Sequence, residues 1–296
     1  MGLVAVDWGT SSLRGARLDD AGRVLEEKSA PQGILAVPAG QFPAVFDSVF
    51  GDWMRPADSF CLISGMAGSQ QGWAEAPYET CPADLPQLVR RLHWIEKDRI
   101  AIVPGLTDDH GGVPDVMRGE EVQIFGAVKL TGIASGLFVL PGTHNKWATV
   151  ENGRVTGFRT CMTGEFYAVL SQHSILGRTM QADAPLDEEA FLRGVAAADN
   201  GEGLLHNAFG ARTLALFKRL SAPALASYLS GVLIGEELRA QPLKGAEQIV
   251  LIGAPALTTR YALALQTFGV GTRTLGAEAT WAGAHALRTA CLQARS

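Results

Sequence analysis

The sequence has little that would mark an exported or disulfide-bonded protein. Its four cysteines, Cys61, Cys81, Cys161 and Cys291, are widely scattered and form no CxxC pair. This argues against a zinc site and against a disulfide framework, and it favours reduced thiols. The N-terminal segment has no basic stretch before its short apolar run, so no signal peptide is predicted. We therefore expect a cytoplasmic protein.

Basic runs and long apolar runs are also missing. Lys and Arg total 25 against 30 Asp and Glu, for a formal net charge of -5, so neither nucleic acid nor an anionic membrane is expected as a partner. Apolar runs such as Ile249 to Ile252 are too short to span a bilayer. Hydrophobic residues nevertheless make up 47% of the 296 positions, which is enough for one large domain or two modest ones.

The common nucleotide-binding fingerprints are absent too. The chain contains neither the Walker A pattern GxxxxGK[ST] nor GxGxxG. A P-loop NTPase, a protein kinase and a Rossmann dehydrogenase therefore lose support. Any nucleotide site must be built in another way.

What the chain does contain is an internal repeat of a polar hairpin. A strand from Leu3 to Val6, the turn Asp7 to Ser12 and a strand from Leu13 to Leu18 form the first copy. The second copy has a strand from Leu137 to Leu140, a turn at 141–146 and a strand from Trp147 to Val150. Both copies contain Gly-Thr and both continue into Gly-Arg-Val, where a third strand is expected, although common hairpin turns could also produce such a match.

The segments that follow each copy alternate between strand and helix patterns. After the first copy, strands at Ser59 to Ile63 and Arg99 to Val103 are expected, with a helix over Leu85 to Ile95 between them. After the second copy, helices are expected near 165–176, 188–197, 203–220, 223–240, 256–267 and 277–291, with strands at 248–252 and 271–275. This order predicts an α/β fold of two similar lobes, 1–132 and 133–296, with an interlobe cleft.

The first turn has the groups that phosphate binding requires. Gly9 lets the backbone approach a phosphate, Thr10, Ser11 and Ser12 offer hydroxyls, and Asp7 can orient Mg²⁺ through water. An ordinary polar hairpin loop is the alternative interpretation.

The second turn offers a comparable set of groups. Its phosphate-binding candidates are Gly142, Thr143, Asn145 and Lys146. His144 and Lys146 could also neutralise phosphate charge.

Several strings carry a resemblance to a known family. The two hairpins and the segment from Ile249 to Pro255 resemble the phosphate and adenosine motifs of the actin-like (ribonuclease H-like) ATPase, sugar kinase and chaperone superfamily. More closely, the chain is similar to 2-dehydro-3-deoxygalactonokinases over nearly its whole length. The strings that carry this likeness are 64–73, 113–121, 140–147 and 163–165, and the most specific are Pro-Asp-Val-Met-Arg-Gly-Glu and Pro-Gly-Thr-His-Asn-Lys-Trp.

The resemblance implies a carbohydrate kinase that uses ATP and Mg²⁺. Its reaction would phosphorylate the terminal (6-) hydroxyl of 2-dehydro-3-deoxy-D-galactonate in galactonate degradation. A kinase for another sugar or sugar acid, or a non-catalytic actin-like nucleotide switch, is the alternative. Adenosine would be held by Gly253, Ala254 and Pro255, although the superfamily usually has Gly-Gly where this chain has Gly253-Ala254. The last helix could return to the first lobe, and a homo-oligomer is left open.

The catalytic base is expected among the acidic residues that precede the second copy. Glu120 follows Gly119, as an Asp follows a Gly in related carbohydrate kinases, so it is the first choice, with Asp115 and Asp109 in reserve. Capping of a helix start is the alternative role for these carboxylates.

The sugar acid needs hydrogen-bonding, stacking and anion-binding groups. Gln70, Gln71 and Trp73 follow the strand at 59–63, where an α/β lobe opens its cleft, and Arg118 could hold the carboxylate. Packing of the Trp and pairing of the Arg with a neighbouring Glu are the alternatives.

Overall fold

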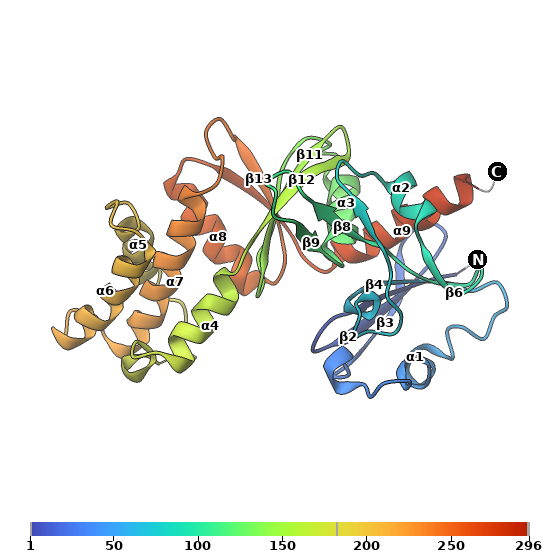
Figure 1. The fold of residues 1–296 in the computed structure, drawn as a ribbon, viewed down its shortest axis with the longest axis horizontal. Coiled ribbons are helices and arrows are strands. Elements are labelled where there is room, and N and C mark those ends of the chain that lie inside the picture. Colours follow the sequence, from blue (N-terminus) through green and yellow to red (C-terminus); the bar gives the residue numbers. More distant parts are fainter. Residues whose placement is uncertain (1, 182, 295–296) are drawn as a thin grey trace. The chain divides into compact units, whose positions relative to one another are not determined.

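The computed structural model describes residues 2–181 and 183–294 and has an α/β architecture (Figure 1). The chain divides into two compact units. The first unit comprises the chain up to residue 136, residues 148–159 and the chain from residue 275 on; the second comprises residues 137–147 and 160–274. Each unit has its own hydrophobic core.

A six-stranded sheet of order β3-β2-β1-β4-β7-β6 forms the first unit. Its strands are β1 (Leu3–Trp8), β2 (Leu13–Leu18), β3 (Val24–Ala30), β4 (Phe60–Gly65), β6 (His93–Glu96) and β7 (Ile100–Ile102). The strands β1, β4 and β7 run parallel, whereas β2 and β6 are antiparallel to their neighbours β1 and β7. The parallel strands therefore end at one common edge.

One expected helix is shorter than predicted. The helix α2 covers only Leu85–Arg90, and the remainder of the segment expected to be helical enters β6. Asp84 begins α2 with a capping box that includes Gln87. Beyond the helix, Asp98 adopts a φ of 62° in the turn that joins β6 to β7. Pairing with β7 thus outweighs the helical pattern of the sequence here.

Helices cover both faces of this sheet. The helix α1 (Phe42–Phe50) packs Phe42, Phe46 and Phe50 in the core that also contains the buried Trp8 of β1. The helices α3 (Glu120–Thr131) and α9 (Glu278–Gln293) pack on each other, and α9 also contacts β1. A Cβ on Gly126 or Gly283 would lie 1.8 Å from a backbone oxygen of the other helix, so only glycine permits this approach.

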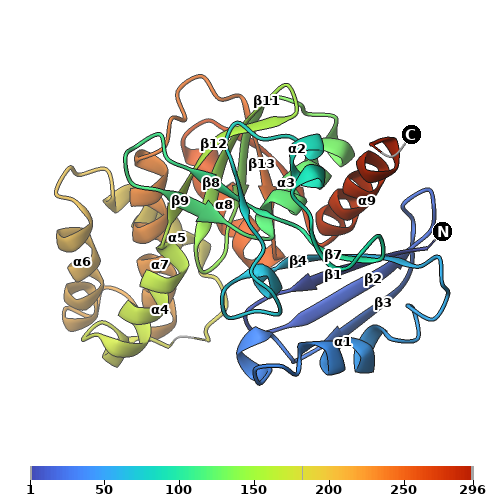
Figure 2. The same ribbon diagram turned by 45° about the vertical axis from the view of Figure 1, so that its right-hand side comes forward.

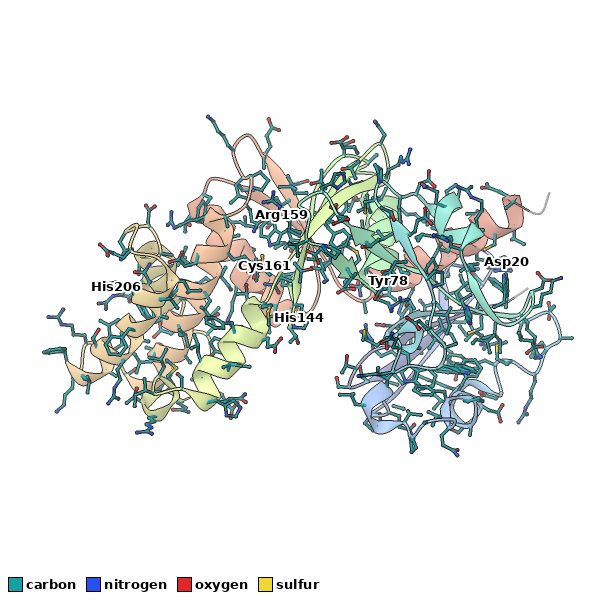
Figure 3. The ribbon with its side chains drawn as sticks, in the orientation of Figure 1. Asp20, Tyr78, His144, Arg159, Cys161 and His206 are labelled. Carbon is teal, nitrogen blue, oxygen red and sulfur yellow. The ribbon has the colours of Figure 1, made fainter. Side chains whose placement is uncertain are left out.

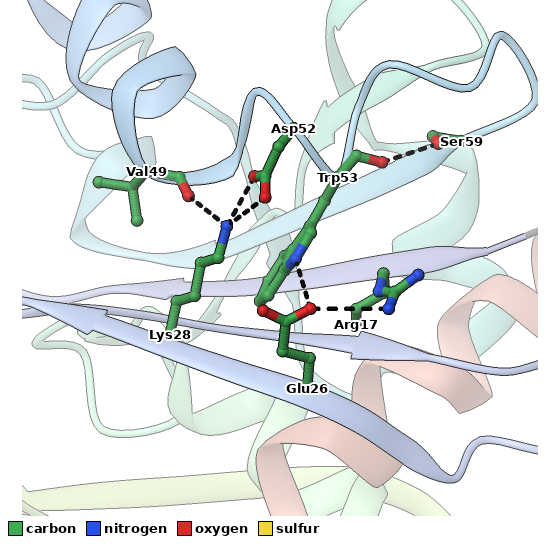
Figure 4. A network of polar contacts seen from close by, with 7 residues as sticks. All are labelled: Arg17, Glu26, Lys28, Val49, Asp52, Trp53 and Ser59. Atoms are coloured by element: carbon green, nitrogen blue, oxygen red, sulfur yellow. Dashed lines mark hydrogen bonds and ion pairs between the residues drawn. The ribbon is translucent and has the colours of Figure 1, made fainter.

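Polar contacts join β3 to the segment that follows α1 (Figure 4). Lys28 donates to Asp52 at 2.6 Å and to the Val49 carbonyl at 3.1 Å. The Trp53 indole donates to Glu26 at 3.0 Å. These bonds hold the surface of β3 beneath α1.

The first unit also contains a small three-stranded sheet that the sequence did not predict. Its strands are β5 (Tyr78–Thr80), β8 (Gly105–Asp108) and β9 (Asp115–Met117). Asp108 accepts a hydrogen bond from the Phe158 amide at 2.8 Å, which attaches this sheet to β12. Strands of three or four residues carry too short a pattern to be recognised from periodicity.

A five-stranded sheet of order β12-β11-β10-β13-β14 follows along the chain, and the second unit contains most of β10, β13 and β14 and the first residues of β11. The strands of this sheet are β10 (Gly136–Leu140), β11 (Asn145–Glu151), β12 (Arg154–Cys161), β13 (Gln248–Ile252) and β14 (Gly271–Leu275). The helices of the second unit are α4 (Thr163–His173), α5 (Glu188–Ala197), α6 (Leu204–Leu216), α7 (Ala222–Arg239) and α8 (Pro255–Thr267).

The buried helix α7 is the centre of the helical layer, because α4, α5, α6 and α8 all pack against it (Figure 2). Short 3-10 turns occur at η1 (Ile34–Ala36), η2 (Met66–Gly68) and η3 (Gly177–Thr179). Across the described residues, no helix is both long and apolar enough to cross a bilayer.

Candidate active site

The first hairpin turn lies at the edge where β1 and β4 end. Asp7 is the register partner of Ser64, and Trp8 is the partner of Gly65. The polar turn follows β1, and η2 with the loop at 69–73 follows β4. Ligands of α/β sheets bind at the carboxyl ends of parallel strands, so this edge is a candidate site.

Hydrogen bonds and close packing fix the backbone of this turn. The Gly9 amide donates to the Ser12 carbonyl at 2.9 Å, and the Ile34 amide of η1 donates to the Gly9 carbonyl at 3.0 Å. Gly33 is in such close contact that a Cβ there would lie 2.3 Å from the Thr10 carbonyl oxygen. The side chains of Thr10, Ser11 and Ser12 are exposed. Fixed backbone and exposed hydroxyls suit a phosphate-binding turn.

Asp7 is the carboxylate of this turn. Its side chain is 15% exposed and forms an ion pair with Arg14, its register partner on β2. Within residues 2–181 and 183–294, no group of three or more His, Cys, Asp or Glu side chains could hold a metal ion. Mg²⁺ that arrives with nucleotide phosphates needs only one or two carboxylates, and Asp7 fits that requirement.

The start of α3 reaches the same edge through two glycines. Gly119 has a φ of 107°, and a Cβ there would lie 3.1 Å from the Gly65 Cα. A Cβ on Gly65 would in turn lie 3.1 Å from Asp7 Oδ1. Asp7, the end of β4 and the start of α3 are therefore in direct contact, which places Glu120 near the first turn.

Both carboxylates at the start of α3 accept hydrogen bonds from preceding amides. Glu120 Oε2 accepts from the Arg118 amide at 2.9 Å, and Glu121 Oε2 accepts from the Gly119 amide at 2.7 Å. Glu120 is half-buried, whereas Glu121 is completely buried. Glu120 is thus the carboxylate of the pair that solvent and a ligand can reach. Glu120 can cap the helix start and still be available to act as a base.

The two reserve candidates lie on other elements. Asp115 is on β9, opposite Asp108 of β8, and Asp109 is exposed in the turn that follows β8. Both belong to the region of the small sheet and not to the ends of β1 and β4.

Glu121 predicts a pH dependence of stability. Burial, and then the nearby charge of Glu120, raises the pKa of Glu121 from 4.5 to about 8. Between these values the unfolded chain loses a proton that the folded protein keeps, so the free energy of unfolding should fall as the pH rises through this range and level off above it. Glu121→Gln should remove this contribution. In melting curves recorded across this pH range, the variant should become more stable relative to the wild type as the pH rises. A difference in melting temperature that does not change with pH would contradict the burial effect.

Three of the four predicted sugar-acid residues line one pocket. A cavity of about 430 Å³ is lined by Gln70, Gln71 and Trp73 together with residues from 37–43, at the start of α1. Gln70 and Gln71 are exposed. The Trp73 ring also packs edge-on against Trp8 at 6.1 Å and near Phe46 at 5.4 Å, so it is part of the core as well.

Arg118 lies beneath this loop and is not among the residues that line the cavity. Its side chain is buried, stacks on the Tyr78 ring at 4.2 Å and donates to the Ala76 carbonyl at 2.8 Å. Its guanidinium therefore supports the chain just after Trp73. The sequence alone could not distinguish this supporting position from one in the pocket.

In the second unit, the second turn and the segment predicted to hold adenosine, residues 253–255, leave the sheet side by side. The parallel strands β10 and β13 pair Val139 with Leu251. A Cβ on Gly253 would lie 3.3 Å from the Pro141 carbonyl oxygen, so the two connections touch. Ala254 is the N-cap of α8, and Pro255 is its first residue. This edge repeats the arrangement found in the first unit.

The second turn has both exposed and buried members. Thr143 and His144 are exposed, and His144 forms an ion pair with Glu165 of α4. Figure 3 labels His144, in the second turn, and Cys161, the last residue of β12 before α4. Asn145 and Lys146 are buried, and Lys146 Nζ donates to Thr160 Oγ1 at 2.7 Å. Thr143 and His144 are therefore the side chains of this turn that a ligand can reach.

A cavity of about 190 Å³ adjoins the second turn. Gly142 and Asn145 form one side, and Tyr167 of α4, Ser230 of α7 and Arg260 of α8 contribute to the rest. The start of α4 is pressed onto the turn, because a Cβ on Gly164 would lie 2.1 Å from the Gly142 carbonyl oxygen. Sequence reasoning missed Tyr167, Ser230 and Arg260, since only the neighbouring Thr-Gly-Glu string signalled this region.

Comparison with solved structures establishes the fold. A structure from Sinorhizobium meliloti, described as a candidate 2-dehydro-3-deoxygalactonokinase, superimposes with a TM-score of 0.87 at 35% identity and covers 97% of this chain and 98% of its own. Component A of (R)-2-hydroxyglutaryl-CoA dehydratase from Acidaminococcus fermentans matches with a TM-score of 0.56 at 16% identity, with each chain covered completely. These likenesses confirm the predicted actin-like α/β fold class.

Sequence comparison identifies the family. The chain is 35% identical to 2-dehydro-3-deoxygalactonokinase of Escherichia coli K12 over 271 residues, covering 90% of each chain. It is 37% identical to DgoK1 of Rhizobium meliloti over 282 residues, covering 93% of this chain and 92% of the relative. A model of the 2-keto-3-deoxy-galactonokinase family matches residues 7–287. This chain therefore belongs to the 2-keto-3-deoxy-galactonokinase family, a family of carbohydrate kinases, as its motifs predicted.

Proposed function

We propose that the protein transfers the γ-phosphoryl group of ATP to the terminal (6-) hydroxyl of 2-dehydro-3-deoxy-D-galactonate in galactonate degradation. Family membership supports this reaction. The observation that supports the proposed reaction most directly is the pair of glycine-containing turns, each at the carboxyl end of parallel strands. The first turn has Asp7 and exposed hydroxyls, and the second lies beside a cavity. Kinases of this kind work mainly by positioning and charge stabilisation, which such turns provide.

The cavity of the second unit suits the nucleoside of ATP. Its wall combines the apolar Leu233, Ile234 and Leu257 with the Tyr167 ring and the Arg260 guanidinium. Pockets for nucleosides and other small molecules are mostly apolar, with a few polar groups that fix orientation. Because Gly142 belongs to the same wall, a nucleoside bound here would direct its phosphates toward the second turn.

The chemical step needs a phosphoryl holder and a base. The Gly9 turn and the hydroxyls of Thr10, Ser11 and Ser12 would bind the phosphoryl oxygens. Mg²⁺ bound near Asp7 would neutralise phosphate charge. Glu120 would accept the proton of the sugar-acid hydroxyl as its oxygen forms a bond to phosphorus and the bond from phosphorus to the bridging oxygen of ADP breaks.

The sugar acid would occupy the cavity at Gln70, Gln71 and Trp73. Amide groups donate to and accept from hydroxyls and a carboxylate, and an aromatic ring covers the apolar face of a sugar chain.

We expect Gln70→Ala and Gln71→Ala each to raise the KM for the sugar acid about five- to tenfold, since one lost hydrogen bond is worth about 1 to 1.4 kcal/mol. The KM for ATP should not change. Gln266→Ala, at an exposed position of α8, is the matched control and should resemble the wild type. Steady-state kinetics with each substrate varied in turn would test this, and an equal rise in both KM values would contradict the assignment.

A coupled assay of ADP release tests the reaction as a whole. The panel should include the galactonate-derived and gluconate-derived 2-dehydro-3-deoxy sugar acids and unrelated hexoses. We expect the highest kcat/KM with 2-dehydro-3-deoxygalactonate. A clear preference for another sugar acid would reassign the substrate, and ATP binding without any acceptor would favour a nucleotide switch.

A further inference from the structure

A buried carboxylate lies directly beneath the second turn. Glu237 of α7 is only 6% exposed. Its Oε1 accepts a hydrogen bond from the Trp147 indole at 2.6 Å, and its Oε2 accepts one from Asn145 Nδ2 at 2.8 Å. The Tyr261 hydroxyl of α8 also donates to Oε2. One carboxylate thus joins β11, α7 and α8.

The hydrogen bonds of this cluster can run in only one direction. An indole and an amide nitrogen are donors only, and an ionised carboxylate is an acceptor only. Burial, and then the charge of Glu237, raises the pKa of Tyr261 well above its ordinary value, so this hydroxyl keeps its proton and donates. Glu237 therefore fixes which end of the Asn145 amide faces α7.

The other end of that amide holds the second turn. Asn145 Oδ1 accepts a hydrogen bond from the Gly142 amide at 2.7 Å. If the Asn145 side chain flipped, its NH₂ group would face the Gly142 N–H and that bond would be lost. Asn145 and Tyr261 also line the cavity beside the turn, so the cluster supports both features.

We infer that Glu237 is a positioning residue that sets the second turn for nucleotide binding, and that Asn145 acts by shaping this turn instead of contacting phosphate. Three donors converge on the carboxylate. Both N–H groups of the Asn145 amide are used by Glu237 and Tyr261, and its Oδ1 accepts from Gly142, so no N–H of this side chain is left to donate to a phosphate. The inference rests on the proposed function to the extent that the turn binds the phosphates of ATP.

Glu237→Gln is the informative substitution. Glutamine keeps the size of the side chain but places an NH₂ group against either the Trp147 N–H or the Asn145 NH₂, so one donor must turn away. We expect the KM for ATP to rise about tenfold or more, as for the loss of a buried charged hydrogen bond, with the sugar-acid KM within about twofold of the wild type. Tyr261→Phe removes one donor and should cause a smaller rise in the same direction.

Glu236→Gln is the matched control. Glu236 precedes Glu237 on α7, and its Oε1 accepts a hydrogen bond from Asn207 at 2.8 Å. This variant loses a carboxylate on the same helix without touching the second turn, so its ATP kinetics should be those of the wild type.

Amide hydrogen exchange gives a readout that needs no substrate. Peptides covering residues 141–147 should exchange faster in Glu237→Gln than in the wild type and Glu236→Gln. If Glu237→Gln matches Glu236→Gln in both exchange and ATP KM, or raises both KM values equally, the positioning role is wrong. If Glu237→Gln does not fold, Tyr261→Phe replaces it in the test. An unchanged KM for ATP and unchanged exchange in Tyr261→Phe would then refute the positioning role. A wild type that phosphorylates no sugar acid would refute the proposed function, while the exchange comparison would still test Glu237.

Discussion

Replacing Asp7 with asparagine is expected to lower kcat at least about 100-fold while the protein stays folded. Asp7 is the carboxylate at the end of β1 and touches the start of the Gly9 turn, so its charge should act on the metal and phosphate and not on the core. Losing such transition-state stabilisation typically costs about 3 kcal/mol, which is roughly two orders of magnitude in rate. The partly exposed pair with Arg14 should add little to stability.

Asp52→Asn is the control for the loss of an ion pair in the same unit. Asp52 pairs with Lys28 of β3 at 2.6 Å and is half exposed, in the segment that follows α1 (Figure 4). Its variant should keep a normal kcat. Steady-state kinetics and thermal melts of both variants would suffice, and a folded Asp7→Asn protein with near-normal turnover would remove Asp7 from metal and phosphate binding.

Replacing Glu120 with glutamine is expected to lower kcat by about 10²- to 10⁴-fold if Glu120 is the base. Binding of ATP and sugar acid should be preserved, because the side chain keeps its size. The amide oxygen can still accept the Arg118 N–H, so the start of α3 should persist. A residue that only caps the helix would behave differently, with a loss of about 0.3 to 1 kcal/mol of stability and nearly full turnover.

The neighbouring Glu121→Gln is the matched control for Glu120→Gln. Glu121 is buried, and its raised pKa of about 8 keeps it protonated at neutral pH, so a neutral amide should leave turnover intact. Single-turnover kinetics at saturating ATP would compare the two variants. Activity in Glu120→Gln together with inactivity in Asp115→Asn or Asp109→Asn would move the base to the inactive position.

The sequence by itself determined the local elements and the family. The strands Leu13–Leu18 and Gly271–Leu275 and the helix Glu188–Ala197 lie where their patterns predicted them. Such elements depend on periodicity, caps and turns within a few residues, which are legible in a single sequence. The motif strings predicted the kinase family because they are long and specific, and the family comparison confirms that prediction.

Only the tertiary structure decided which residues meet. It turned the end of the expected helix at 85–95 into β6, brought Gly65 against Gly119, and placed Arg118 beneath the loop that carries Gln70 and Gln71. It also joined Asn145 to Glu237 across 92 positions of sequence. These contacts arise when elements distant in the sequence pack together. Their free energy depends on the shape and burial of both partners, so no local sequence pattern encodes them.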